Sequence, residues 1–286
     1  MNNNSNQGLS LGQKSVVFLQ KLIASPYILW MLVFILVPLA MVVYFAFTTA
    51  DGAFTFENIK AVGQYTNIFV RSIYLAAIAT VICLVMSYPV AFILARMNKN
   101  TQSTLLMLVM LPMWMNFLLR TYAWMTILGN NGILNSFLNL LGFESVKLLN
   151  TQGAVVLGMV YNYIPYMILP LYSIMVKIDK SVIEAAQDLG CNSIKVLFKV
   201  VLPLSLPGII SGVTMVFVPA ISTFIISKML GGGSELLIGD LIEMQFLGNA
   251  YNPNLGAAIS LVLMIIVLII MTIMNKFGDN DEASLI

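Results

Sequence analysis

The chain has 286 residues, of which 59% are hydrophobic and 9% charged, and its mean hydropathy is +0.93. Soluble domains are about one quarter charged, so this chain lacks the polar groups needed to cover a water-facing surface. The formal net charge of +2, without a basic stripe, argues against nucleic-acid binding. Histidine is absent, and Cys83 and Cys191 form no CxxC pair, which removes the usual metal ligands and disulfide frameworks. The composition therefore indicates an integral membrane protein.

The first 26 residues are mostly polar and include Lys14 and Lys21. The apolar run that follows is too long for the core of a signal peptide, and no small-residue cleavage site comes after it. We therefore expect residues 1–26 to be a cytoplasmic segment and the run to be a retained first membrane helix.

Six stretches are long and apolar enough for transmembrane helices, which need about 20 residues each. Prolines lie within or at the ends of several of them and predict kinks, since neighbouring groups in a membrane bundle can satisfy the freed carbonyls. The prediction is an all-α polytopic membrane protein with a six-helix domain at 27–276 and a C-terminal tail at 277–286. The predicted spans are 27–47, 72–95, 103–127, 154–176, 204–230 and 255–274.

Lysine and arginine in short loops set the orientation of membrane helices. With the N-terminus inside, only Lys60, Arg71 and Lys147 fall in outer loops. We therefore predict that both termini are cytoplasmic. The outer loops are acidic, which would attract cations, although the same positive-inside bias leaves any outer face acidic. The predicted inner set is Lys14, Lys21, Arg96, Lys99, Lys177, Lys180, Lys195, Lys199 and Lys276.

The outer loop at 129–150 contains apolar residues at helical spacing. We expect a short helix there, lying on the outer surface or across the helix ends. The residues are Ile133, Leu134, Phe137, Leu138 and Leu141.

The cytoplasmic loop at 177–203 predicts two short helices. Ser181 is placed to cap the first, at 180–189, and Glu184 three residues later would complete a capping box. Gly190 fits the position after the helix, where a left-handed backbone conformation is needed.

The second helix of this loop should begin after Asn192 or Ser193, which are both good caps. Lys195 and Lys199 would point away from its apolar face, and Pro203 would end it near the membrane boundary. The apolar face comprises Ile194, Leu197, Phe198, Val201 and Leu202.

The first helix of the loop is thin on one side, because Ala185 and Ala186 have small side chains. Such a helix can enter a groove on another protein, and Glu184 could pair with a basic residue there. The alternative is an amphipathic linker that lies on the membrane face.

The loop resembles the signature loop of ABC importer permeases: Glu-Ala-Ala, three residues, Gly, and Leu-Pro twelve and thirteen residues after that Gly. One mild departure is Val200, where the pattern usually has Ile. The resemblance implies the type I ABC importer permease fold and a coupling helix held in a cleft of a cytoplasmic ATPase. The matching residues are Glu184, Ala185, Ala186, Gly190, Leu202 and Pro203.

The same resemblance implies the partners. They are a second homologous permease forming a heterodimer, two cytoplasmic ATPase subunits and an extracellular binding protein. This chain has no Gly-x-x-x-x-Gly-Lys-Ser/Thr motif, so a partner would bind the ATP. We expect a transporter subunit of the bacterial inner membrane that is not itself an enzyme and holds no cofactor.

Two further motifs, at 112–124 and 232–246, resemble those of spermidine/putrescine importer permeases. The resemblance implies inward transport of polyamines. The alternatives are a related importer for sulfate, molybdate, iron or thiamine, or an ion-driven carrier. The last predicts an internal repeat, which the sequence lacks.

A polyamine needs carboxylates for its ammonium groups and aromatic faces for cation–π contact. Asp240 and Glu243 are three residues apart and would share a helix face. Aromatic residues also collect at membrane interfaces for other reasons. The candidate substrate path is Trp114, Arg120, Tyr122, Trp124, Tyr161, Asp240 and Glu243, with Tyr163 and Tyr166 as further aromatics.

Arg120 and Lys228 do not suit a simple cation path, since buried cations in a bilayer are costly and usually paired or functional. Arg120 could pair with a helix-end carbonyl or with Asp240, and Lys228 could extend to the outer interface. If the cargo were an oxyanion, both cations would instead face the pore.

Overall fold

The computed structural model describes residues 26–233, 236–248 and 250–282, and these residues form helices and short connections without a named strand. The predicted segment 1–26 lies almost wholly outside them. The elements in chain order are η1 (Leu32–Leu36), α2 (Val37–Ala46), α3 (Glu57–Val62), η2 (Gly63–Tyr65), α4 (Thr66–Leu94), α5 (Lys99–Trp114), α6 (Phe117–Leu128), α7 (Ile133–Leu140), α8 (Gln152–Met175), α9 (Lys180–Asp188), α10 (Ser193–Val196), η3 (Leu197–Val201), α11 (Leu202–Leu204), α12 (Leu206–Ile221), α13 (Ile225–Leu230), α14 (Ile238–Phe246) and α15 (Pro253–Glu282).

Four of the described helices are long and apolar enough to cross a membrane, and there are up to six spans if each of two bent pairs counts as one. This agrees with the predicted all-α fold. The predicted short helix within 129–150 is also confirmed, as α7. The predicted tail at 277–286 lies partly in α15 and partly outside the described residues. The four helices are Pro26–Ala46, Glu57–Leu94, Gln152–Met175 and Pro253–Lys276.

The third predicted span, 103–127, is not one straight helix. α5 ends at Trp114, and the chain turns by 88° before the helices that begin at Phe117. The Asn116 side chain accepts hydrogen bonds from the amides of Leu118 and Leu119, at 2.8 and 3.4 Å, so it starts a new helix. An asparagine in an apolar run therefore breaks the span.

The fifth predicted span, 204–230, is also broken. α12 ends at Ile221 and α13 begins at Ile225. The carbonyls freed at the end of α12 still have donors. The Ser222 hydroxyl donates to Val218 at 3.2 Å, and the Tyr163 hydroxyl donates to Pro219 at 3.3 Å. Such local compensation is what allows a membrane helix to break.

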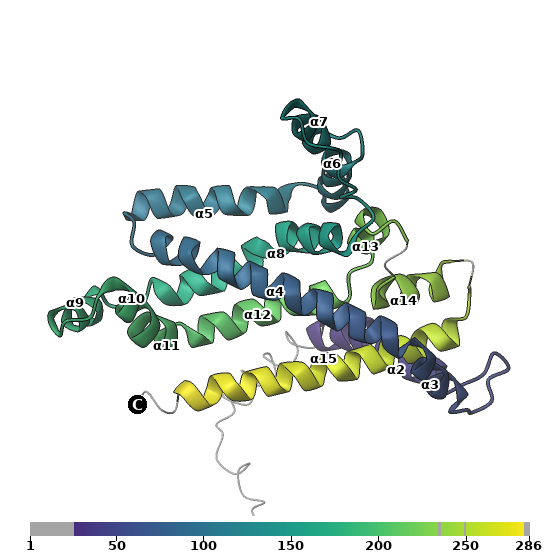
Figure 1. Ribbon diagram of the computed structural model, residues 1–286. Coiled ribbons are helices and arrows are strands. Elements are labelled where there is room, and N and C mark those ends of the chain that lie inside the picture. Colours follow the sequence, from purple (N-terminus) through teal and green to yellow (C-terminus); the bar gives the residue numbers. More distant parts are fainter. Residues whose placement is uncertain (1–25, 234–235, 249, 283–286) are drawn as a thin grey trace, which may run out of the picture.

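The core lies where α4, α8 and α12 run beside one another (Figure 1). Gly208 and Gly212, one turn apart on α12, allow the close approach to α8. A Cβ atom at Gly212 would meet the Met167 sulfur at 2.6 Å. Small residues at this spacing are a common device for packing membrane helices.

The two ends of the bundle carry different elements. Figure 1 shows α9, α10 and α11 at one end, near the α4–α5 connection and the end of α15, whereas α3, α13 and α14 lie toward the opposite end. The predicted coupling loop and the predicted outer carboxylates are therefore far apart along the helices.

Candidate functional site

The helix α9 of the predicted coupling loop begins after Asp179, not at a Ser181 cap. The Asp179 carboxylate accepts a hydrogen bond from the Ser181 amide at 3.0 Å, and this bond lowers the pKa of Asp179. The predicted capping box of Ser181 and Glu184 is therefore wrong. The Asp179 backbone is extended, which aims its carboxylate at the first free amides of the helix, and an ionised acceptor there is stronger than a hydroxyl.

The end of α9 agrees with the prediction at Gly190, although the last helical residue is Asp188 and not Leu189. Gly190 has φ +83°, in the left-handed region. Its amide donates to the Gln187 carbonyl at 2.8 Å, and the Cys191 amide donates to Ala186 at 3.1 Å. These two bonds make a Schellman motif, which satisfies the last carbonyls of the helix.

None of the residues of α9 is buried. Glu184, Ala185 and Gly190 are exposed, and the apolar Leu189 at the helix end is 86% exposed. A helix of nine residues is marginal in water without tertiary packing. This helix therefore presents a surface suited to a partner.

Arg96, at the end of α4, lies beside this helix. Its guanidinium stacks on the Phe92 ring at 3.5 Å and donates to the Phe92 carbonyl at 3.2 Å. Arg96, Lys180 and Glu184 line a small cavity of about 230 Å³ that also touches Ile183 and Gln187. A cation in the turn just after α4 thus lies beside the carboxylate of Glu184 on α9.

The second half of the loop begins as predicted. The Asn192 side chain accepts from the Lys195 amide at 2.9 Å and starts α10. The continuous helix that starts at Ser193 ends at Leu204, one residue after Pro203, which agrees with the predicted end near Pro203. The π turn η3 precedes Pro203, and the direction changes by 69° between the helices ending at Leu204 and beginning at Leu206.

Two residues of the predicted substrate path are brought together. Trp124 on α6 and Tyr161 on α8 meet edge to face, with ring centroids 5.3 Å apart. Both line a mainly apolar cavity of about 690 Å³ between α4, α6 and α8. By contrast, Trp114 is 69% exposed and Tyr122 is 53% exposed, so neither joins this cluster.

Arg120 is 8% exposed, and among the described residues its Nε and Nη1 atoms have no hydrogen-bond partner. Its guanidinium lies 5.9 Å from the Phe117 ring centroid. Of the two partners considered for Arg120, a helix-end carbonyl or Asp240, the second is wrong, since the described residues contain no ion pair between Arg120 and Asp240.

Asp240 and Glu243 are both on α14, but other groups of this chain engage them. The buried Asp240 carboxylate accepts from the Leu237 amide at 2.9 Å and caps α14. Glu243 pairs with Lys228 of α13 at 3.0 Å, so Lys228 is tied to a carboxylate rather than extended alone to the interface. The two acids therefore do not form an open cation site in this conformation.

Residues 87–277 match the family described as binding-protein-dependent transport system inner membrane components. The chain belongs to this family. Its members are membrane components of ABC transporters and not enzymes, which agrees with the several apolar spans found here.

Curated relatives of this family member cover most of its length. The spermidine/putrescine transport system permease protein PotB of Haemophilus influenzae is 38% identical over 86% of this chain and 90% of the relative. The PotB protein of Escherichia coli is 37% identical, over 83% of this chain and 90% of that relative. The inner membrane ABC transporter permease protein YdcU of E. coli is 28% identical, over 79% of this chain and 77% of that relative.

Solved structures confirm the fold of this permease family member. A chain of a bacterial ABC transporter involved in the import of the acidic polysaccharide alginate superposes with a TM-score of 0.79 at 16% identity, over 92% of this chain and 96% of that one. A second structure of a bacterial alginate ABC transporter, in complex with a periplasmic protein bound to an alginate pentasaccharide, gives 0.78, also at 16% identity, over 91% and 94%.

Arg96 is predicted to lie on the inner side, but the sequence motifs assign neither Arg96 nor Asp179 a role at the coupling loop. Both could have been found from position, since Arg96 ends the second span on the same side as the loop, and Asp179 stands just before a predicted helix.

Proposed function

We propose that this chain is the membrane-spanning permease subunit of an ATP-driven importer that moves polyamines into the cell. Identities of 37–38% to spermidine/putrescine permease proteins, over more than four fifths of this chain, support the cargo. Both termini would be cytoplasmic. A second, homologous permease would complete a heterodimeric pore, and a periplasmic binding protein would deliver the substrate.

Two cytoplasmic ATPase subunits would supply the energy, one of them docked on α9. The observation that carries the proposal is that no residue of this helix is buried and most of its residues are exposed. Ala185 and Ala186 keep one side thin, and Glu184 offers a charge to a basic partner residue. Leu202 and Pro203 lie in α11, at the other end of the same loop, and would support its shape.

ATP-driven closure of the two ATPases would move the α9 loop and shift the permease between inward- and outward-facing states. Such a shift needs contacts that differ between the two states. The chain breaks at Met115–Asn116, where the Asn116 side chain accepts from two amides, and at Ser222–Phe224, where the Val218 and Pro219 carbonyls have side-chain donors. Both breaks are suited to such rearrangement, because these backbone groups are already satisfied locally.

The candidate path has features that suit a polyamine. Trp124 and Tyr161 offer aromatic faces beside an apolar cavity, which fits a chain of methylenes with cationic ends. Glu243 would receive an ammonium group when Lys228 releases it.

Arg120 favours a second candidate function, the import of an anion. A guanidinium that is 8% exposed and lacks partners on two nitrogens could bind an oxyanion. The similarity to polyamine permease proteins favours the first candidate.

The test is uptake in a strain that lacks its own polyamine importer. The complete set of genes, with this permease, should restore ATP-dependent uptake of radiolabelled spermidine or putrescine, and unlabelled sulfate or molybdate should not compete. Uptake of labelled sulfate or molybdate, without polyamine uptake, would favour the anion importer and contradict the polyamine proposal.

A further inference from the structure

The bend at the end of the coupling loop is centred on Ser205. This residue is fully buried between α11 and α12, where the chain turns by 69°. Its amide lies within hydrogen-bond distance of the Val201 and Leu202 carbonyls, and its hydroxyl donates to the Leu202 carbonyl at 3.0 Å. Any change in the angle between the loop and α12 therefore passes through Ser205.

The Ser205 hydroxyl has a second partner on another helix. The Tyr88 hydroxyl of α4 lies 3.0 Å from the Ser205 oxygen. Because Ser205 gives its one proton to Leu202, Tyr88 is the donor in this bond. In the part of the chain that the structure describes, no other side chain of residues 72–94 is hydrogen-bonded to residues 193–221.

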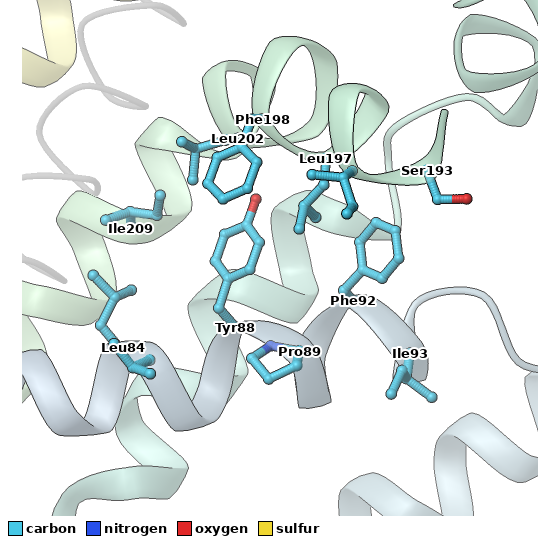
Figure 2. Close-up of a pocket in the computed structure, with 12 residues that line it drawn as sticks. Leu84, Tyr88, Pro89, Phe92, Ile93, Ser193, Leu197, Phe198, Leu202 and Ile209 are labelled. Carbon is cyan, nitrogen blue, oxygen red and sulfur yellow. The ribbon is translucent and has the colours of Figure 1, made fainter. Parts of the chain in front are cut away.

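An apolar groove of about 540 Å³ separates much of the loop from α4. Figure 2 shows Tyr88 extending from α4 toward Phe198 and Leu202, with Phe92 facing Leu197 farther along. Contacts across such a groove are weak and permit relative movement, since unfilled space forfeits dispersion contacts. The Tyr88–Ser205 bond is therefore the directional connection across it.

The connection continues from α4 into the core. Ser87, the neighbour of Tyr88, is buried and donates to the Ile164 carbonyl of α8 at 3.5 Å, and the Cys83 sulfur lies 3.8 Å from the Val160 carbonyl. A displacement that reaches α4 at Tyr88 is thus passed to the helix that carries Tyr161 and Tyr163.

We propose that Tyr88 and Ser205 are positioning residues that make α4 follow the coupling loop when the ATPases close. This inference rests on the proposed docking at α9 and names the residues through which docking acts on the membrane helices. Without the bond, the bend at Ser205 can change while α4 stays in place, so ATP is hydrolysed without a matching movement of substrate.

The test uses the complete transporter reconstituted in liposomes, with the second permease, the ATPases and the binding protein. Substrate moved per ATP hydrolysed is measured for Y88F, S205A and the double variant. Each single variant should keep assembly and basal ATP hydrolysis and lower this ratio by about fivefold, as expected for a modest coupling energy. The double variant should be no worse than either single one, because both remove the same bond.

The matched control is Y172F. The Tyr172 hydroxyl of α8 donates to Gln102 of α5 at 3.0 Å. The Y172F variant therefore loses an interhelical bond of the same length as the Tyr88–Ser205 bond, but one that does not involve the coupling loop. Y172F should keep the wild-type ratio. A wild-type ratio in Y88F or S205A, additive losses in the double variant, or an equal loss in Y172F would overturn the inference.

The proposed function fails in a different way. If the wild-type complex transports no polyamine but couples another cargo to ATP, the polyamine assignment falls, and the ratio for that cargo still tests Tyr88 and Ser205. If the wild-type complex shows no ATP-driven transport at all, the proposed function and the inference about Tyr88 and Ser205 are both wrong.

Discussion

The two ends of the bundle use their polar groups in opposite ways. At the α9 end, Glu184 is exposed and Gly190 closes a helix with no buried residue. At the α14 end, the carboxylates are satisfied within the chain, by the Leu237 amide at Asp240 and by Lys228 at Glu243, and the Ile238 amide donates to Ser72 of α4 at 2.9 Å. In our proposal a partner covers the first end, whereas the second end must break internal bonds to accept a cation.

The substitution expected to have the largest effect on the α9 end is Gly190→Val. A branched side chain in the left-handed region costs about 1–2 kcal/mol and should unwind the end of α9. We expect loss of ATPase retention during purification and at least a tenfold fall in uptake. Gly142→Val is the control, since Gly142 has φ +84° and a Cβ atom there would meet no atom within 4 Å, but this glycine lies after α7 at the other end. Equal ATPase loss in both variants would refute docking at α9.

Reversal of charge at α9 should have the next largest effect. If Glu184 meets a basic ATPase residue, Glu184→Lys replaces attraction with repulsion and should weaken ATPase binding by about tenfold. Glu144→Lys makes the same charge change at an exposed site on the predicted outer side. Titration of the purified ATPase against both variants in nanodiscs measures the affinity, and unchanged binding by E184K would show that Glu184 is not at the interface.

Lys228→Gln tests whether Glu243, at the α14 end, can bind a substrate cation. Removal of the ammonium frees Glu243 for a substrate cation, so the KM for spermidine uptake should fall by about threefold if Glu243 lies on the path. Lys147→Gln, on the predicted outer loop, controls for net charge. A higher KM in K228Q would contradict a cation-binding role for Glu243.

Asp240 should give the smallest effect when its charge alone is removed. Asp240→Asn keeps an acceptor for the Leu237 amide, so folding and uptake should stay near wild type. Asp240→Ala removes the cap, which costs about 1 kcal/mol and should lower Tm by about 3 °C. A folded D240N protein with no uptake would show that the charge is needed, contrary to a capping role.

The sequence predicts most of the α9 end, because its signals are local. The left-handed Gly190 and the Asn192 cap depend on a few neighbouring residues, and both are found. Asp179 caps α9 in place of Ser181 because its ionised carboxylate is a stronger acceptor than a hydroxyl.

The α14 end and the broken spans depend on contacts between distant residues. Nothing near Asp240 in the sequence shows that Arg120 stays apart from it, or that Lys228 reaches Glu243 fifteen residues away. Asn116 is an exception, since a polar cap inside an apolar run is a local signal for a broken helix.

The most direct measurement of docking uses the two native cysteines. Cys191 follows Gly190 and is partly exposed, whereas Cys83 is fully buried in α4 and serves as an unreactive internal reference. A water-soluble maleimide should label Cys191 in the permease pair without ATPases, and the added ATPases should slow that labelling by about tenfold. Equal labelling rates with and without bound ATPases would contradict the docking of this loop.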